Sequence, residues 1–172
     1  DAGCEYEIYA SDITRCIPVG GKFTQAQREL YNMVLETQLK IIKMIKPGVL
    51  RSELHSRSEE LLCRGMVKLG ILKGECKKLL KKQHHKKYYP HGIGHWMGLD
   101  VHDEAPYKDE KGNEIPLKEG MVLTIEPGIY IDKDDTSVAK KYRGIGIRIE
   151  DNILVTSKGH ENLSCDIAKS VE

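Results

Sequence analysis

The spacing of apolar positions predicts two amphipathic helices in the first half of the chain, over 24–45 and over about 52–69. Thr24 followed by Gln27 forms a capping-box pattern at the start of the first helix. Pro47 and Gly70 follow the two predicted ends, as is typical of helix termination. The apolar stripes consist of Leu30, Val34, Ile41 and Ile45 in the first helix and of Leu54, Leu61, Leu62, Met66 and Leu69 in the second.

Short β-branched runs separated by Gly, Pro, Asn and Asp predict strands in the remainder of the chain. Residues 1–18 alternate loosely, and we expect extended chain there with a turn near Gly3. The order of strands, two helices and strands predicts an α+β domain with helices packed on one side of an antiparallel sheet. The later strands are expected at Val101, 121–125, 129–131, 145–149 and 153–155, with surface loops over 104–119 and 132–142.

Residues 74–87 are rich in lysine, which is typical either of a nucleic-acid-binding patch or of a short surface helix with solvated lysines. We favour the surface helix, because the 172-residue chain has 27 Lys and Arg against 26 Asp and Glu. Only Tyr88 and Tyr89 supply aromatic side chains in this segment. No apolar run reaches the length of a transmembrane helix. We therefore expect neither a nucleic-acid nor a membrane partner.

The five cysteines have irregular spacing and form no Cys-x-x-Cys motif. This pattern argues against a disulfide framework or a zinc knuckle and predicts free thiols. Free thiols persist in a reducing compartment, so a cytoplasmic location is expected.

His91, His95 and His102 lie close together in the sequence, with glycines between them. Glycine lets the backbone approach a ligand closely, and imidazole can bind a metal or transfer a proton near neutral pH. The glycines at 92 and 94 argue against a helix over 91–95. We therefore expect only one histidine of the 91–95 pair to be a metal ligand.

Four carboxylates stand out as a set: Asp1, Asp12, Glu126 and Glu150. Taken alone, the two aspartates would be ordinary turn residues. Strand alternation places Arg148 on the same face as Glu150, and a structural ion pair between them is an alternative to a catalytic role. Four carboxylates with one imidazole suit two divalent ions that share ligands, and ligation rich in oxygen favours Mn²⁺. No Gly-x-Ser-x-Gly elbow or P-loop occurs, and a cysteine nucleophile paired with histidine remains an alternative.

Several longer stretches carry a resemblance to a known family. They include Asp-Ala-Gly-Cys-Glu-Tyr (1–6), Ser-Asp-Ile-Thr-Arg (11–15), His-Gly-Ile-Gly-His-Trp-Met-Gly-Leu-Asp-Val-His-Asp (91–103), Gly-Met-Val-Leu-Thr-Ile-Glu-Pro-Gly (120–128) and Tyr-Arg-Gly-Ile-Gly-Ile-Arg-Ile-Glu-Asp (142–151). Together they resemble the C-terminal catalytic part of bacterial Xaa-Pro aminopeptidases (aminopeptidase P), in the creatinase/prolidase/methionine aminopeptidase superfamily. The resemblance covers nearly the whole chain.

The resemblance implies a pita-bread fold and assigns 1–172 to the C-terminal portion of a metallopeptidase catalytic domain. It also implies that an N-terminal domain and the start of the catalytic domain precede residue 1 in family members, so that the fold is N-terminally truncated in this chain. We therefore expect the 172-residue chain by itself to hydrolyse peptides much more weakly than the full-length protein. The full-length protein is expected to be a homo-oligomer.

The resemblance further implies a role for each candidate site residue. The implied metal ligands are Asp1 for one ion, Asp12 and Glu150 as bridges, and His95 with Glu126 for the second ion. Glu126 is also the implied general base. Of the remaining residues, His102 would contact the scissile carbonyl region, His91 would help to form the pocket on the proline side, and Arg148 would support the site electrostatically.

The implied function is metal-dependent hydrolysis of an N-terminal Xaa-Pro bond by a water molecule activated between two metal ions. Mn²⁺ is the expected metal, with Co²⁺ or Zn²⁺ as alternatives, and the substrates are peptides with proline in the second position. A prolidase acting on Xaa-Pro dipeptides is the main alternative, because prolidases share His91 and the Gly-x-Arg-x-Glu run. A non-catalytic binding module of pita-bread fold is a further alternative, although such modules typically lose metal ligands.

Overall fold

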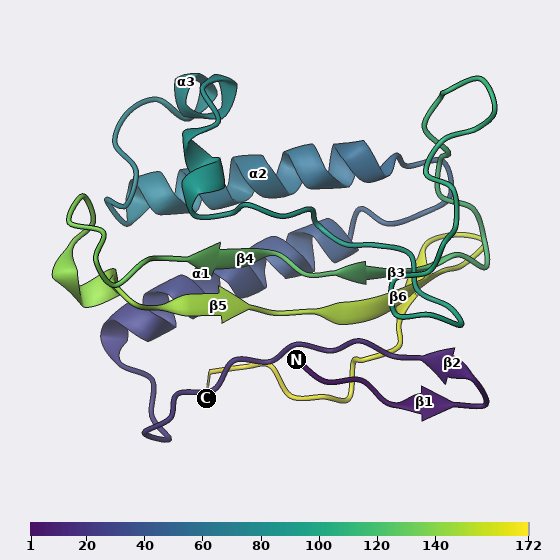
Figure 1. Ribbon diagram of the computed structural model, residues 1–172, viewed down its shortest axis with the longest axis horizontal. Helices are drawn as coiled ribbons and strands as arrows, with labels where there is room; N and C mark the ends of the chain where they lie inside the picture. Colours follow the sequence, from purple (N-terminus) through teal and green to yellow (C-terminus); the bar gives the residue numbers. More distant parts are fainter. Residues whose placement is uncertain (172) are drawn as a thin grey trace.

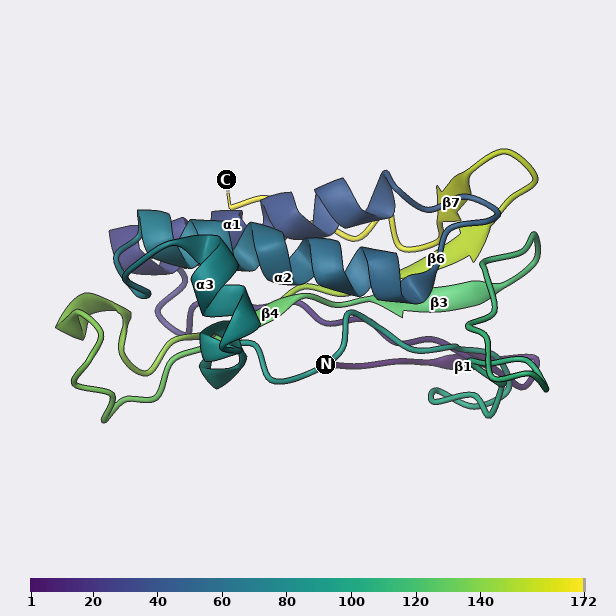
Figure 2. The same cartoon turned by 90° about the horizontal axis from the view of Figure 1, so that it is seen from above.

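Two long helices cover one face of an antiparallel sheet, and the N-terminal segment lies against the opposite face (Figure 1, Figure 2). The structure is a computed structural model in which residues 1–171 are described. Its strands are β1 Glu5–Tyr6, β2 Tyr9–Ala10, β3 Val122–Ile125, β4 Gly128–Tyr130, β5 Gly146–Arg148, β6 Asp151–Val155 and β7 His160–Asn162. Its α-helices are α1 Gln25–Ile42, α2 Arg51–Lys68 and α3 Cys76–Lys81, and short 3₁₀ turns span His84–Lys87 and Lys140–Tyr142.

Helix α1 begins as predicted, with a capping box at Thr24. The Thr24 hydroxyl accepts a hydrogen bond from the Gln27 N–H, and the Gln27 side chain accepts one from the Thr24 N–H. The helix ends at Ile42, earlier than the predicted residue 45. Its last turn tightens, because Met44 and Ile45 donate to carbonyls three residues back. Helix α2 matches the prediction within one residue at each end, and Gly70 follows it with a φ of 72°.

Strand β3 pairs with β6 and strand β4 with β5, and both ladders keep one register (Figure 1). Ile125 stands opposite Asp151 before the interruption, and Gly128 stands opposite Arg148 after it. Pro127 lies inside the interruption and has no N–H to donate. Because the register is unchanged, Glu126 faces Glu150 across the gap.

Alternation along these strands separates an apolar face from a polar face. The apolar face packs on α1 and α2 in two clusters of buried side chains. One cluster contains Val34, Leu62, Ile129 and Ile147, and the other contains Ile41, Leu54, Leu123 and Ile153. The predicted layering of helices on one side of an antiparallel sheet is therefore confirmed.

The N-terminal segment differs from the prediction in the position of its turn. Strands β1 and β2 form a hairpin whose turn is Glu7 and Ile8, with φ values of 48° and 67°. Gly3 is not a turn residue. It lies so close to the chain just after β2 that a Cβ there would come within 1.8 Å of the Ser11 carbonyl oxygen.

Val101 lies in a bend rather than in the predicted strand, because the chain there turns between Gly98 and Asp103. The lysine-rich segment forms α3 and a 3₁₀ turn, with Leu79 and His85 buried and the lysines exposed, so a short surface helix is present as predicted. All five cysteines are free thiols. Within residues 1–171, none of the helices has both the length and the apolar character needed to cross a membrane.

Candidate metal centre

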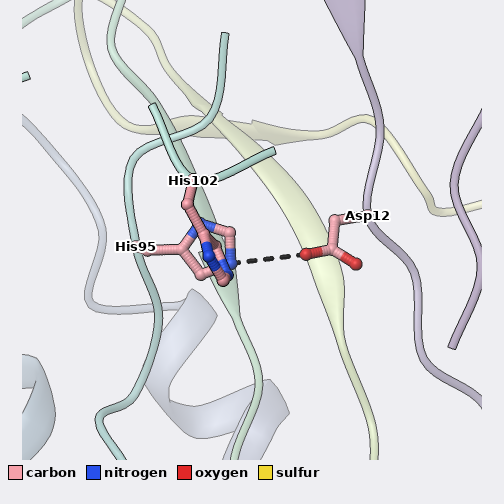
Figure 3. A group of neighbouring side chains, drawn as sticks. All are labelled: Asp12, His95 and His102. Carbon is pink, nitrogen blue, oxygen red and sulfur yellow. Dashed lines mark ion pairs between the residues drawn. The ribbon is translucent and has the colours of Figure 1, made fainter. Parts of the chain in front are cut away.

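The candidate site lies on the polar face of the sheet, where three parts of the chain meet. The N-terminal segment supplies Asp1 and Asp12, and the loop before β3 supplies His95 and His102. The two strand interruptions supply Glu126 and Glu150. Figure 3 shows Asp12 facing the imidazole rings of His95 and His102, which meet edge to face with their centroids 4.2 Å apart.

His95 is held so that its Nε2 atom points at the carboxylates. Its Nδ1–H donates to the Trp96 carbonyl at 2.9 Å, so Nε2 is the ring nitrogen that the neutral imidazole offers as a ligand. That Nε2 atom lies 3.3 Å from Oδ2 of Asp12 and 3.6 Å from Oε1 of Glu126. The His95 N–H donates to the Thr124 hydroxyl at 3.1 Å. The backbone passes so close to β3 here that only glycine fits before His95, since a Cβ on Gly94 would lie 1.9 Å from the Thr124 carbonyl oxygen.

Glu150 is almost fully buried, with 1% of its surface exposed, and one hydroxyl holds it in place. Thr14 donates its hydroxyl hydrogen to Oε2 of Glu150 at 2.7 Å. Burial raises the pKa of the Glu150 carboxyl to about 7, because the charged form loses its hydration; the Thr14 hydrogen bond opposes this, and the Glu126 and Asp12 carboxylates add to it. A carboxylate in such surroundings is stabilised by a bound cation.

Arg148 lies between the N-terminal segment and the sheet. Its Nε atom donates to the Thr14 hydroxyl at 3.0 Å and lies 3.9 Å from Oε2 of Glu126, and its Nη2 atom pairs with Asp1. Since Arg148 and Glu150 both contact the Thr14 hydroxyl, the prediction that they share a face is confirmed. The alternative of a direct ion pair between them is not what the structure contains, because Arg148 pairs with Asp1 and Glu126 instead.

The donor atoms fit a pair of divalent ions. Three groups, each with its ligand atoms within 4.8 Å of one another, overlap in this space. They are Asp12 with His95 and His102, His95 with Glu126 and Glu150, and Asp1 with Asp12 and Glu150. Each group shares a residue with the next, as expected where two ions have ligands in common. Hard carboxylate oxygens with one or two imidazoles are the ligand set of Mn²⁺, Co²⁺ or Zn²⁺ sites.

His91 is not part of the overlapping donor groups and lies beside Gly128, where a Cβ would come within 3.1 Å of its Nε2 atom. Its Nδ1–H donates to the Gly92 carbonyl at 2.8 Å, and its Nε2 accepts from the Tyr130 hydroxyl at 2.8 Å. Its ring meets Tyr89 and Tyr130 edge to face. Residues 91–95 form no helix, as the glycines predicted. His91 is thus held in place by Tyr130 and packs against the buried ring of Tyr89.

Sequence reasoning missed three polar residues that hold the candidate ligands. Thr14 contacts Glu150, and Thr124 donates to Oε1 of Glu126 at 3.3 Å. Asn152, in the amide orientation that satisfies both groups, donates to the Asp12 carbonyl at 2.7 Å and accepts from the Asp12 N–H at 3.2 Å. Each of the three lies two positions from a candidate ligand, and strand alternation could have identified them.

A partly buried cluster of four carboxylates and an imidazole, where three parts of the chain meet, is the donor set expected of a two-metal hydrolase. The chain belongs to metallopeptidase family M24, which it matches over residues 1–157. Membership of this family implies the use of divalent metal ions.

The relatives it resembles are Xaa-Pro aminopeptidases. The enzyme of Escherichia coli (strain K12) is 48% identical over 172 residues, which is all of this chain and 38% of the relative. Two solved structures of E. coli aminopeptidase P, one zinc-substituted in complex with product and one with the inhibitor Pro-Leu, match at 47% identity with a TM-score of 0.92, over 98% of this chain and 38% of theirs. Pseudomonas aeruginosa aminopeptidase PepP matches at 43% identity with a TM-score of 0.94, over 98% of this chain and 38% of that one.

These matches confirm the predicted pita-bread fold for the part of the chain that the structure describes. The chain spans 38% of the length of the E. coli relative.

Proposed function

We propose that the protein containing this chain removes the N-terminal residue from peptides whose second residue is proline. The observation that carries the proposal is the convergence of Asp12, His95, Glu126 and Glu150 in overlapping donor groups, in a chain 48% identical to a named Xaa-Pro aminopeptidase. A binding module without catalysis is disfavoured because every donor needed for two ions is present. The inhibitor Pro-Leu in the E. coli relative supports a site that accepts proline.

We assign the metal ligands to five of the six residues that form the overlapping groups, leaving His102 for contact with the substrate. Asp1, Asp12, His95, Glu126 and Glu150 would hold two divalent ions, with Asp12 and Glu150 shared between them. Such a pair of ions lowers the pKa of a water molecule held between them and polarises the scissile carbonyl. We expect Mn²⁺ on the basis of the oxygen-rich ligand set. Zn²⁺ is an alternative that the zinc-substituted E. coli relative supports.

The remaining steps fall to side chains of this chain. Glu126 accepts the proton of the attacking water as general base, with one oxygen oriented by the Thr124 hydroxyl and the other facing Arg148. His102 is exposed beside His95 and is placed to donate to the carbonyl oxygen of the scissile bond. His91 forms part of the pocket on the proline side, fixed by Tyr130.

Replacing Glu126 with glutamine in the full-length protein tests the proposal. Turnover of an Xaa-Pro-Xaa tripeptide should fall by about 100- to 10,000-fold, the contribution typical of a general base, while circular dichroism remains that of the wild type. Glu119→Gln, at an exposed position, is the matched control and should leave turnover unchanged. Retained activity in the Glu126 variant would show that this residue is not the base.

Substrate length separates the aminopeptidase from the prolidase alternative. The full-length protein should cleave tripeptides and longer peptides with proline in the second position. A clear preference for Xaa-Pro dipeptides in the same assay would contradict the aminopeptidase proposal and favour the prolidase.

A further inference from the structure

Gln38 is a buried glutamine of α1 that reaches the sheet where both ladders are interrupted. Its side-chain nitrogen donates to the carbonyls of Ile125 and Ile149, each at 3.2 Å. None of its surface is exposed. These two carbonyls belong to the residues directly before Glu126 and Glu150, so a single amide joins the two strands at the base of both candidate ligands.

The interruption in the ladder creates the need for this donor. Pro127 stands opposite Ile149, and the Ile149 N–H donates to the Pro127 carbonyl at 3.4 Å. The reciprocal hydrogen bond cannot form, because proline has no N–H. A buried carbonyl without a donor is costly. Gln38 supplies the donor from the helix layer and thereby takes the place of the missing ladder bond.

A second contact fixes the orientation of the amide. Lys169 donates from Nζ to Oε1 of Gln38 at 3.0 Å and also pairs with the buried carboxylate of Asp151. An ammonium can only donate and a carbonyl can only accept, so the amide oxygen must face Lys169 and its nitrogen must face the strands. Asp151 is further held by Arg15 at 2.8 Å. Both hydrogen atoms of the amide are thus directed at the interruption.

Gln38 is a polar residue in the apolar stripe of α1, at a position where packing alone would favour an apolar side chain. One helical turn before it, Val34 belongs to one apolar cluster, and nearly one turn after it, Ile41 belongs to the other. An apolar side chain at position 38 would continue the stripe of the helix. The polar side chain instead lies where the two clusters meet, directly behind the two glutamates.

We propose that Gln38 is a positioning residue that sets the separation of the strands carrying Glu126 and Glu150, and so the spacing of two carboxylates of the metal centre. The inference rests on the proposed function for the identity of these carboxylates as ligands. Loss of the two donated hydrogen bonds lets the strands move apart at the interruption. Two ions that share ligands then bind less tightly, because metal affinity depends on the neighbouring groups that hold the ligands in the correct orientation.

Two substitutions in the full-length protein test the proposal. Gln38→Met keeps the length of the side chain and removes both donors. Gln38→Glu keeps the shape and the contact with Lys169 but offers the two carbonyls at most one donor, the hydroxyl of a protonated carboxyl, in place of two N–H groups. Thr37→Val is the matched control, because it removes a buried hydrogen bond of the same helix, from the Thr37 hydroxyl to the Met33 carbonyl, away from the interruption.

Two measurements read the effect. In the metal-free protein, the amide hydrogens of Glu126 and Glu150 donate to the carbonyls of Ile93 and Thr14, and their exchange with solvent should speed up at least about tenfold in both Gln38 variants but not in Thr37→Val. Calorimetric titration with Mn²⁺ should show about 10- to 100-fold weaker binding in the Gln38 variants. Equal exchange rates in the wild type and a folded Gln38 variant would overturn the proposal.

The two measurements separate this proposal from the proposed function. If the wild type binds no Mn²⁺, the proposed function fails, and the exchange rates of the metal-free protein still decide whether Gln38 holds the strands. If exchange speeds up in both Gln38 variants but Mn²⁺ binding stays within twofold of the wild type, the positioning role toward the metal centre is overturned. Should Gln38→Met fail to fold, Gln38→Glu decides.

Discussion

Replacing Thr14 with valine probes the dependence of the metal centre on one buried hydroxyl. This hydroxyl donates to Glu150 at 2.7 Å and accepts from Arg148 at 3.0 Å. Valine has nearly the same shape, so the substitution removes the two hydrogen bonds with little change in packing. Thr14 is itself 5% exposed, and water cannot readily replace the lost hydroxyl.

The magnitude follows from the kind of bond that is lost. A hydrogen bond to a charged group contributes about 1.5–3 kcal/mol, and its loss leaves the Arg148 Nε–H without its partner. If Glu150 is a shared ligand, this corresponds to roughly 10- to 100-fold weaker metal binding. The Thr14 hydrogen bond also lowers the pKa of Glu150, which burial raises to about 7. Without Thr14 this pKa rises further, more of the carboxyl is protonated at neutral pH, and the deficit in affinity should shrink as the pH is raised.

Isothermal titration of the full-length protein with Mn²⁺ measures this effect directly. Thr14→Ser retains the hydroxyl and should bind the metal much as the wild type does, which distinguishes the hydrogen bond from the methyl group. Thermal unfolding of each metal-free variant controls for loss of fold. Binding by Thr14→Val within about twofold of the wild type at neutral pH would refute the reasoning, since it would mean that Glu150 is positioned without Thr14 or is not a ligand.

Three further perturbations test other parts of the structure: chelation of the metal, addition of a methyl group at Gly94, and removal of the Tyr142 hydroxyl. A chelator should lower the thermal unfolding midpoint of the full-length protein, because ions bound only by the folded state stabilise it; an unchanged midpoint would contradict a resident metal. Gly94→Ala should destabilise by about 1–3 kcal/mol or more in urea titrations, because of the close Thr124 carbonyl, whereas Gly159→Ala, with open space around it, should not. Tyr142→Phe should raise the pKa of Glu29, which the Tyr142 hydroxyl chiefly holds at about 2, toward 4.5 in an NMR titration. The stability from Glu29 is present above about pH 4.5 and lost as the pH falls toward 2, so this variant should lose less stability in acid; an unshifted titration would contradict the contact.

The helices were predictable because local signals and burial agree. The predicted capping residues Thr24 and Gln27 form the capping box of α1 in the structure, and the apolar stripes of the helices face the sheet. The hairpin at Glu7 and Ile8 was not predictable in the same way. Both residues have positive φ, a conformation that is uncommon for any residue other than glycine and rare for a β-branched side chain such as Ile8. The sequence there contains no Gly, Asn or Asp to indicate a turn.

The candidate ligands were predictable as a set, but their arrangement was not. Alternation places Glu126 and Glu150 on one face of their strands, yet only the register of pairing puts them opposite each other. Register depends on contacts between distant parts of the chain, and a shift of one residue would turn either glutamate toward the core. The unchanged register on both sides of Pro127 is therefore what makes a shared site possible.

Pro127 and Gln38 show how a local sequence feature can depend on a distant one. The Glu-Pro-Gly run suggests a strand interruption, since proline removes a ladder donor. It does not suggest what satisfies the carbonyl of Ile149 on the partner strand. The compensating signal is a polar residue in an apolar helical stripe, with Val34 four positions before Gln38 and Ile41 three positions after it. Such a residue is costly unless it has buried partners, so an interrupted strand and a polar residue in a covering helix, read together, predict the contact that neither indicates alone.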